Sequence, residues 1–301
     1  MALRSFQDLT IYHQMTAMIG DASNQLNQKY HTLRLSFPSE WVLHVELART
    51  KQLNTMDMQF FVDVKTVFEA VLNSSSVRAV VLSASSESRL FTAGLDLKAA
   101  QMFPQQTEDP ARTALGFLPA VEFLQQSFSA IEACNKPIIA AIHGACIGGG
   151  MDMITACDIR WCSKDALFSV KEVDIGIAAD LGTLQRLPKI VGNDGWAREI
   201  CFTGRMVSSS EALQFGLVSR VFDDKNKLLS AAFELASEIS AKAPIAIYGT
   251  KHIMNHGREH TTEEGLKYVR LWNSVMINTP DTMAQVTSAV TKSKPPLFPK
   301  L

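Results

Sequence analysis

Three carboxylates near a glycine run are the side chains of this chain best suited to chemistry. Asp152 follows directly on Gly148-Gly149-Gly150-Met151, a stretch typical of the entry to a helix, and Glu172 and Asp180 come later in the chain. The residues around them, such as Ile177-Ala178-Ala179, are mostly apolar, so we expect the acids to lie in an apolar cleft. Carboxyl groups crowded into such a cleft have shifted pKa values, which suits them to moving protons to and from carbon.

Each acid also has a structural interpretation. An Asp in the first turn of a helix often only stabilises the helix dipole. Glu172 and Asp180 could instead lie on a solvated loop and form ordinary ion pairs with Lys171 or Arg186. Asp174, in the same stretch, is expected to be structural and is the internal comparison. The joint placement of three acids in apolar surroundings favours the catalytic interpretation.

The elements that must position these acids alternate between strand and helix. Helical spacing of apolar residues predicts a helix over residues 56–72, and further helices are expected over 112–134 and from the glycine run onward. This order predicts an α/β core with crossover connections. Short apolar runs bounded by turn signals predict strands over residues 33–37, 41–47, 78–83 and 137–142.

The C-terminal third differs, because helices follow one another there. Ser208 and Glu211 form a capping-box pattern before a short helix, and residues 217–222 are the last run typical of a strand. We therefore divide the chain into an N-terminal extension (1–30), an α/β core (31–223) and a helical region (224–301) suited to a lid or to oligomerisation. The helices expected in that region span residues 228–242, 244–256, 261–277 and 281–291.

The composition limits the class of protein. A chain of 301 residues with 47% hydrophobic content can bury a large core, and no uncharged apolar stretch is long enough to cross a membrane. The net charge of -1 gives no electrostatic reason to expect nucleic acid or anionic lipid as a partner. The 5 cysteines form no CxxC pair and no zinc spacing with histidine, so we expect core thiols in a reducing compartment and no metal site. A nicotinamide-binding glycine motif and a Walker motif are also missing from the sequence.

Three ordered segments resemble the enoyl-CoA hydratase/isomerase (crotonase) superfamily, and the resemblance runs from about His31 to the C-terminus. Phe91-Thr92-Ala93-Gly94-Leu95-Asp96 is similar to that family's oxyanion and CoA-binding loop. Lys136-Pro137-Ile138-Ile139-Ala140-Ala141-Ile142-His143-Gly144 leads into the glycine run, and Gly182-Thr183-Leu184-Gln185-Arg186-Leu187-Pro188 is the third segment. The resemblance implies an α/β spiral of ββα units with a helical C-terminal region that mediates homotrimers, often paired into homohexamers.

The carboxylates narrow this resemblance. Asp152 stands where the hydratases of the superfamily have Glu, Glu172 fills the second acidic position and Asp180 adds a third, a trio similar to that of the dienoyl-CoA isomerases. The resemblance implies isomerisation of a 3,5-dienoyl-CoA to a 2,4-dienoyl-CoA in fatty acid β-oxidation, with no cofactor apart from the CoA that the substrate carries. The substrate-binding residues that it implies are Thr92, Ala93, Gly94, Leu95, Asp96, Gly149 and Gly150.

An isomerisation of this kind removes a proton at C2 and returns one at C6, and these carbons are too far apart for one carboxylate to serve both. We assign Asp180 as the base at C2 and Glu172 as the acid at C6, an order that could be reversed. Asp152 then orients the substrate or tunes the protonation of the pair. The charge that develops on the thioester oxygen needs N–H donors; Gly149, at a helix N-terminus, could supply one, and the resemblance implies Ala93 for the other.

Two other functions and several single residues remain open. A 2-enoyl-CoA hydratase is the nearest alternative, and a crotonase-like nucleic-acid-binding protein is disfavoured by the near-neutral charge. His143 is expected to be structural rather than a base, and Arg49 and Lys51 could meet CoA phosphates or lie on a solvated loop.

The two ends of the sequence bear on location. Residues 1–30 have the features of neither a secretory signal nor a transit peptide. The final Pro299-Lys300-Leu301 is related to the Ser-Lys-Leu peroxisomal address, so a peroxisomal location is expected, with the mitochondrion as the alternative.

Overall fold

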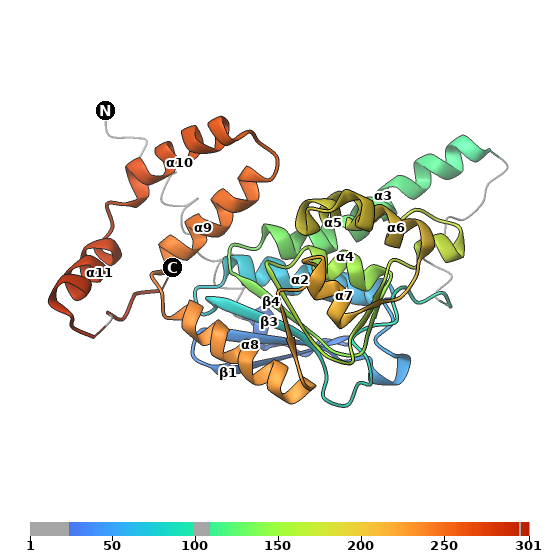
Figure 1. Cartoon of the computed structure of the whole chain (residues 1–301), viewed down its shortest axis with the longest axis horizontal. Helices are drawn as coiled ribbons and strands as arrows, with labels where there is room; N and C mark the ends of the chain where they lie inside the picture. The colour runs from blue at the N-terminus through green and yellow to red at the C-terminus, as the bar shows by residue number, and fades with distance from the viewer. Residues whose placement is uncertain (1–23, 99–108, 295, 301) are drawn as a thin grey trace, which may run out of the picture.

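A six-stranded sheet forms the centre of the fold (Figure 1). The structure, a computed structural model, describes residues 24–98, 109–294 and 296–300. The strand order is β1-β2-β3-β4-β6-β9; β1 and β2 pair antiparallel, and the following neighbours pair parallel. The strands are β1 (Leu33–Ser39), β2 (Val42–Leu47), β3 (Ala79–Ala84), β4 (Ile138–Ile142), β6 (Ile159–Ser163) and β9 (Arg220–Phe222).

Both faces of this sheet are buried. Val80 and Leu82 of β3 belong to the larger apolar core, whereas Val81 packs in a second cluster with Leu228 and Ala232 of α8 (Lys225–Ser240). Parallel strands that are covered on both faces have continuous apolar sequences rather than alternating ones. This is why short apolar runs were sufficient to predict β3 and β4.

Two long helices cover the face of the sheet on which the larger core lies. α2 (Met58–Asn73) begins at Asp57, whose side chain accepts the Phe60 N–H at 2.9 Å and so satisfies one of the unpaired donors of the first turn. α3 (Pro110–Ala133) begins with a proline, which is favoured at the first helical position because its missing N–H costs nothing there. The two helices pack against each other and bring apolar side chains to one side of the candidate site.

A smaller three-stranded sheet leads directly into the acidic segments. Its strands, in the order β5-β7-β8, are β5 (Ala145–Ile147), β7 (Leu167–Ser169) and β8 (Val207–Ser208). β5 runs into α4 (Gly149–Thr155), which contains Asp152, and β7 runs into the short 3-10 helix η3 (Glu172–Ile175). Because β5 and β7 pair in parallel, the segments that follow them begin side by side. The next helices are α5 (Thr183–Val191), α6 (Asp194–Thr203) and α7 (Ser209–Gln214).

The C-terminal helices divide into one that packs on the sheet and three that extend from it. α8 covers the central sheet, although it falls within the helical region 224–301 expected from the sequence. α9 (Pro244–Gly257), α10 (Thr262–Met276) and α11 (Pro280–Thr291) project away from the sheet (Figure 1). Large apolar side chains are exposed on α10 and α11, among them Leu266, Leu271, Val275, Met283, Val286 and Val290.

Most elements expected from the sequence are present, with two differences in detail. Ser208 caps α7 by accepting the Glu211 N–H, but the Glu211 carboxylate binds Trp196 and Arg205 instead of completing the capping box. The last predicted strand is reduced to β9. Of the N-terminal extension, residues 1–23 lie outside the described residues. Among the described residues, the elements missing from the prediction are β5, β6, β7, β8, α5, α6 and the 3-10 helices η1 (Thr50–Gln52) and η3.

In the part of the chain that the structure describes, no helix is both long enough and apolar enough to span a membrane. All 5 cysteines are unpaired and buried, which confirms the prediction of core thiols.

Candidate active site

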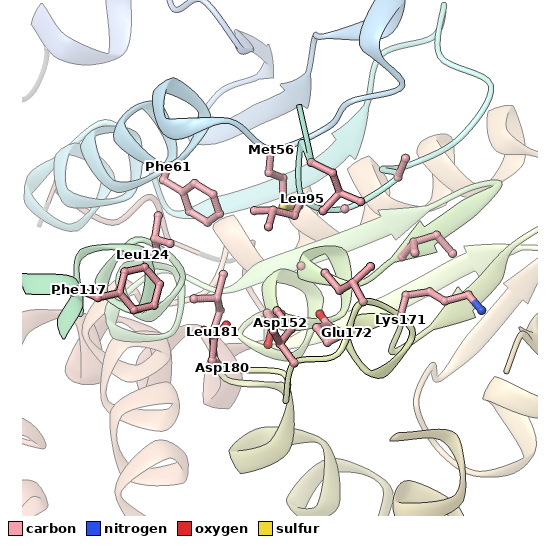
Figure 2. Close-up of a pocket in the computed structure, with 18 residues that line it drawn as sticks. Met56, Phe61, Leu95, Phe117, Leu124, Asp152, Lys171, Glu172, Asp180 and Leu181 are labelled. Carbon is pink, nitrogen blue, oxygen red and sulfur yellow. The ribbon is translucent and has the colours of Figure 1, made fainter. Parts of the chain in front are cut away.

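An apolar cavity of about 340 Å³ contains all three predicted catalytic acids. Figure 2 shows Asp152 and Glu172 on one wall of this cavity, opposite Met56 and Leu95. One end is lined by apolar side chains from α2, α3 and the loop before α5, namely Phe61, Phe117, Leu124 and Leu181. The cavity therefore combines a long apolar compartment with a cluster of acids, as expected for proton transfer along an apolar chain.

Two glycines allow the upper loop and the start of α4 to approach each other closely. Gly94 has a φ of +85°, and a Cβ there would lie 2.8 Å from the carbonyl oxygen of Ile147. Gly148 has a φ of +53°, and a Cβ there would lie 3.4 Å from a carboxylate oxygen of Glu172. Gly94 needs both the positive φ and the absence of a side chain, whereas at Gly148 the positive φ alone favours glycine. The close approach places the loop around Leu95 against the N-terminus of α4.

Two backbone N–H groups that line the cavity are free to bind an oxyanion. Gly149 is the first residue of α4, where N–H groups have no partner within the helix. Among the described residues, neither the Gly149 N–H nor the Leu95 N–H has a hydrogen-bond acceptor. Ala93 lines the cavity as expected, but its N–H donates to the Leu53 carbonyl at 3.0 Å. The Ala93 N–H is therefore occupied, contrary to the predicted donor role, and within the described residues the Leu95 N–H is the unpaired donor on the same loop.

Three of the predicted substrate-binding residues, Thr92, Asp96 and Gly150, support the cavity wall without lining it. Thr92 Oγ1 donates to the Asn54 carbonyl at 2.7 Å and accepts the Gly94 N–H at 3.1 Å, which holds the loop in place. A Cβ on Gly150 would lie 2.5 Å from the Thr92 methyl carbon, so Gly150 provides close packing.

The Asp96 carboxylate holds the other end of the same loop. It accepts hydrogen bonds from Arg49 at 3.3 Å and Thr55 at 3.1 Å. Arg49 also pairs with Asp57 at 3.0 Å, so it belongs to an ion-pair network rather than to a solvated loop. Lys51 is exposed.

Asp152 is buried in the first turn of α4 and is tied to the next acidic segment. It is 1% exposed, and its Oδ1 accepts the Thr183 N–H, at the start of α5, at 2.6 Å. Burial, and to a smaller extent the charge of Asp180, raises the pKa of Asp152 to about 6. The hydrogen bond between Asp152 and the Thr183 N–H fixes α5, and with it the loop that carries Asp180, to α4.

Glu172 is the buried acid whose loss of solvation is least compensated by hydrogen bonds. It is 8% exposed, and within the described residues its Oε2 has no hydrogen-bond partner. Burial, followed by the charge of Asp152, raises the pKa of Glu172 to about 7, so the protonated form is populated near neutral pH. Lys171, which could have neutralised it, pairs with Asp174 instead. The alternative of an ordinary ion pair for Glu172 is therefore excluded.

Asp180 borders the cavity but its side chain also reaches solvent. Asp180 as a whole is exposed, but its carboxyl group is partly buried against the cavity, and this burial raises the pKa of the carboxyl above its usual value. Its backbone carbonyl accepts a hydrogen bond from Gln125 of α3 at 2.7 Å. Arg186, the proposed ion-pair partner, binds Glu132 at 2.9 Å and the Leu181 carbonyl, so Asp180 also lacks the ordinary ion pair.

The residues expected to be structural lie away from the cavity. Asp174 is exposed and paired with Lys171. His143 is buried, and its Nε2 lies 2.9 Å from the Ser88 carbonyl and 3.1 Å from Lys225 Nζ. Neither residue lines the cavity, which agrees with the sequence interpretation. Within residues 24–98, 109–294 and 296–300, no cluster of three His, Cys, Asp or Glu side chains could hold a metal ion.

Several residues of the site cannot be recognised as site residues from the sequence. The Leu95 N–H became a candidate only because the structure shows that the Ala93 N–H is occupied. Gly94, between them, has a positive φ in the structure, but a glycine in the sequence does not reveal which neighbouring N–H is free. Phe61 and Leu124 lie on helices that were predicted, Phe61 on a predicted apolar face, but the sequence does not distinguish core positions from cavity positions.

The raised pKa of Glu172 predicts a pH-dependent stability. Below pH 4.5, Glu172 is neutral in both the folded and the unfolded chain. As pH rises from there to about 7, only the unfolded chain loses the proton, so the folded state is progressively destabilised. Glu172→Gln removes this effect and is expected to gain up to about 3 kcal/mol of unfolding free energy over the wild type above pH 7.

Chemical denaturation at several pH values measures this difference, with Glu69→Gln on the exposed side of α2 as the matched control. A difference between wild type and Glu172→Gln that stays constant from pH 4 to pH 8 would contradict the raised pKa.

The comparisons with known proteins agree with this geometry. The sequence model of the enoyl-CoA hydratase/isomerase family matches residues 38–296. The chain belongs to this family. A mitochondrial Delta(3,5)-Delta(2,4)-dienoyl-CoA isomerase of Rattus norvegicus is 44% identical over 279 residues, which cover 91% of this chain and 85% of the relative.

A plant relative and a solved structure of the enoyl-CoA hydratase/isomerase family extend the comparison. A peroxisomal Delta(3,5)-Delta(2,4)-dienoyl-CoA isomerase of Arabidopsis thaliana is 42% identical, covering 84% of this chain and 91% of its own. The crystal structure of an enoyl-CoA hydratase from Bacillus anthracis superposes with a TM-score of 0.79 at 27% identity, over 88% of this chain and 98% of that chain. The fold is therefore the crotonase-like fold expected from the sequence.

Proposed function

We propose that this protein isomerises 3,5-dienoyl-CoA to 2,4-dienoyl-CoA in fatty acid β-oxidation. The observation that carries the proposal is a third acid, Asp180, on the wall of an apolar cavity that also holds Asp152 and Glu172. The rat and plant relatives, both named for this reaction and more than 40% identical, support it. The substrate carries its own CoA, and we propose that no other cofactor takes part.

The thioester is expected to bind with its carbonyl oxygen at the Leu95 and Gly149 N–H groups. These donors stabilise the charge that develops on the oxygen when a proton leaves C2. The acyl chain then extends along the apolar end of the cavity, toward Phe61 and Leu124. This placement brings the conjugated carbons past the three acids.

The protonation states of the acids favour one order of proton transfer. Glu172, with a pKa of about 7, is partly protonated near neutrality and is the acid that protonates C6. Asp180 is more exposed than Glu172 and ionises more readily, so it is the base that removes the C2 proton. Asp152 holds the Asp180 loop through Thr183 and couples electrostatically to both acids.

The direct test is to mix the purified protein with a 3,5-dienoyl-CoA and follow the ultraviolet absorbance of the conjugated 2,4-dienoyl thioester. Rapid growth of this absorbance supports the proposal. No growth, together with addition of water to a 2-enoyl-CoA, would instead assign the protein to hydratase activity.

The role of Asp152 predicts different effects for two substitutions. Asp152→Asn keeps an oxygen that can accept the Thr183 N–H, whereas Asp152→Ala leaves that buried N–H unpaired. An unpaired buried donor costs about 1–3 kcal/mol, so only the Ala variant is expected to lose this much unfolding free energy. Denaturant unfolding of both variants measures the difference, and equal losses in both would contradict a positioning role.

Oligomeric state and location are further parts of the proposal. We propose a homotrimer or homohexamer assembled through the exposed apolar side chains of α10 and α11, which light scattering would test. For the location, the rat relative is named mitochondrial and the plant relative peroxisomal. The peroxisomal address at Pro299-Lys300-Leu301 stays a prediction, with the mitochondrion as the alternative; Leu301 lies outside the described residues.

A further inference from the structure

Asp180 lies on the boundary between two cavities of different character. The first is the apolar cavity described above, and the second is a polar cavity of about 400 Å³ on the other side of the Asp180 loop. Asp180 and Leu181 line both cavities, whereas Glu172 lines only the apolar one. The two acids that exchange protons with the substrate therefore differ in their access to solvent.

The polar cavity has the chemistry of a water-filled space rather than of an anion site. Its main cations are paired with acids: Arg186 and Arg258 bind Glu132, at 2.9 and 3.1 Å, and Lys189 binds Glu259 at 2.5 Å. A volume of about 400 Å³ has room for several water molecules, each of which occupies roughly 30 Å³ in the liquid. Paired side chains offer such waters both donors and acceptors.

The walls of the polar cavity also hold the Asp180 loop in place. Gln125 donates to the Asp180 carbonyl at 2.7 Å, and Arg186 Nη1 donates to the Leu181 carbonyl at 3.4 Å. A Cβ on Gly182 would overlap the Arg186 guanidinium, so the loop can lie on this side chain only because glycine occupies that position. Asp180 is thereby kept at the boundary instead of folding into either cavity.

The proposed reaction leaves the two acids in the wrong protonation states. After one turnover Asp180 holds the proton from C2, and Glu172 has given its proton to C6. The next turnover requires Asp180 to lose one proton and Glu172 to gain one. A closed route would pass the proton from Asp180 to Glu172 inside the protein, through Asp152, and would carry substrate hydrogen into a later product.

We propose that Asp180 discharges its proton into the polar cavity, so that the hydrogen added at C6 comes from solvent. The O–H bond of the Asp180 carboxyl breaks and a water in the polar cavity accepts the proton. Glu172 takes up a proton from water that enters the apolar cavity after product leaves, so the protons balance over the cycle. This inference rests on the proposed function.

Isotope transfer distinguishes the two routes. A 3,5-dienoyl-CoA that carries deuterium at both C2 positions is converted in ordinary water over many turnovers, and mass spectrometry locates the deuterium in the product. We expect C6 to receive almost only solvent hydrogen. Deuterium retained at C6 in most product molecules would overturn the inference. Absence of any 2,4-dienoyl product would instead contradict the proposed function itself.

A cavity-filling variant supplies the second readout. Gln185 is an exposed residue of α5 that lines the polar cavity, and Gln185→Phe fills part of the space with an apolar ring. Leu184→Phe, one residue earlier and outside both cavities, is the matched control. In stopped-flow experiments, Gln185→Phe is expected to show a normal first turnover followed by slower turnovers and more deuterium at C6. Unchanged later turnovers and unchanged C6 deuterium in Gln185→Phe would overturn the proposal.

Discussion

Replacing Asp180 by Asn is expected to lower kcat for 3,5-dienoyl-CoA by about 10³-fold, because a positioned acid or base contributes roughly 10²–10⁴-fold to a proton transfer. The amide of Asn cannot remove the C2 proton, and Asp152, the neighbouring carboxylate, is engaged with the Thr183 N–H. Glu172→Gln is expected to cause a loss of the same order because the buried amide has no proton to give to C6. The KM should change much less than kcat, since neither side chain is needed to hold the thioester.

The control for both variants is Glu69→Gln. Glu69 lies on the exposed side of α2, pairs with Lys65 at 2.9 Å and is outside the cavity. Glu69→Gln should leave kcat unchanged. The acid pair would be disproved as the catalytic groups if Asp180→Asn or Glu172→Gln kept wild-type kcat on the dienoyl substrate.

Gly94→Ala is expected to lower kcat by about 10²–10³-fold through loss of one oxyanion donor. The new Cβ would lie 2.8 Å from the Ile147 carbonyl oxygen, which is backbone and cannot rotate away as a side chain would. The loop must therefore shift, and the Leu95 N–H shifts with it. Donors of an oxyanion hole are effective only within about 3 Å of the developing charge, so a small shift is costly.

The positive φ of Gly94 adds a separate cost in unfolding free energy to Gly94→Ala, which must be distinguished from the effect on kcat. Gly216, at the end of α7, has a φ of +80°, close to the +85° of Gly94, but a Cβ there meets nothing within 4 Å. Gly216→Ala therefore reports the cost of the backbone conformation alone, as a loss of unfolding free energy with unchanged kcat. An equal kcat for Gly94→Ala and wild type, measured by the absorbance assay, would show that the Leu95 N–H is not a donor.

Much of the fold could be predicted because its buried strands and amphipathic helices have distinct patterns. The apolar runs at β3 and β4 and the helical spacing of α2 required no knowledge of the partners they pack against. The strands of the smaller sheet were missed because they are only two or three residues long, too short for a periodic pattern. These short strands nevertheless set the positions of Asp152 and Glu172.

The site was predictable where it depends on residue type and not where it depends on backbone hydrogen bonds. Asp152, Glu172 and Asp180 stood out because carboxylates are unusual in apolar segments, and the structure places all three on one cavity. The choice between the Ala93 and Leu95 N–H groups depends on whether Leu53, distant in sequence, accepts one of them. No local pattern reports such a contact, so the sequence interpretation assigned the wrong donor.

The oxyanion donors and two of the three acids lie on separate pieces of the chain, which bears on how this scaffold changes its reaction during evolution. The proposed donors, the Leu95 and Gly149 N–H groups, would activate any acyl thioester, whereas Glu172 and Asp180 lie on a short 3-10 helix and a loop. On the proposed roles, we expect point mutations in these two segments to alter which protons move and to leave the donors of the thioester in place. A lineage can therefore acquire a new reaction while each intermediate sequence still binds and activates its substrate.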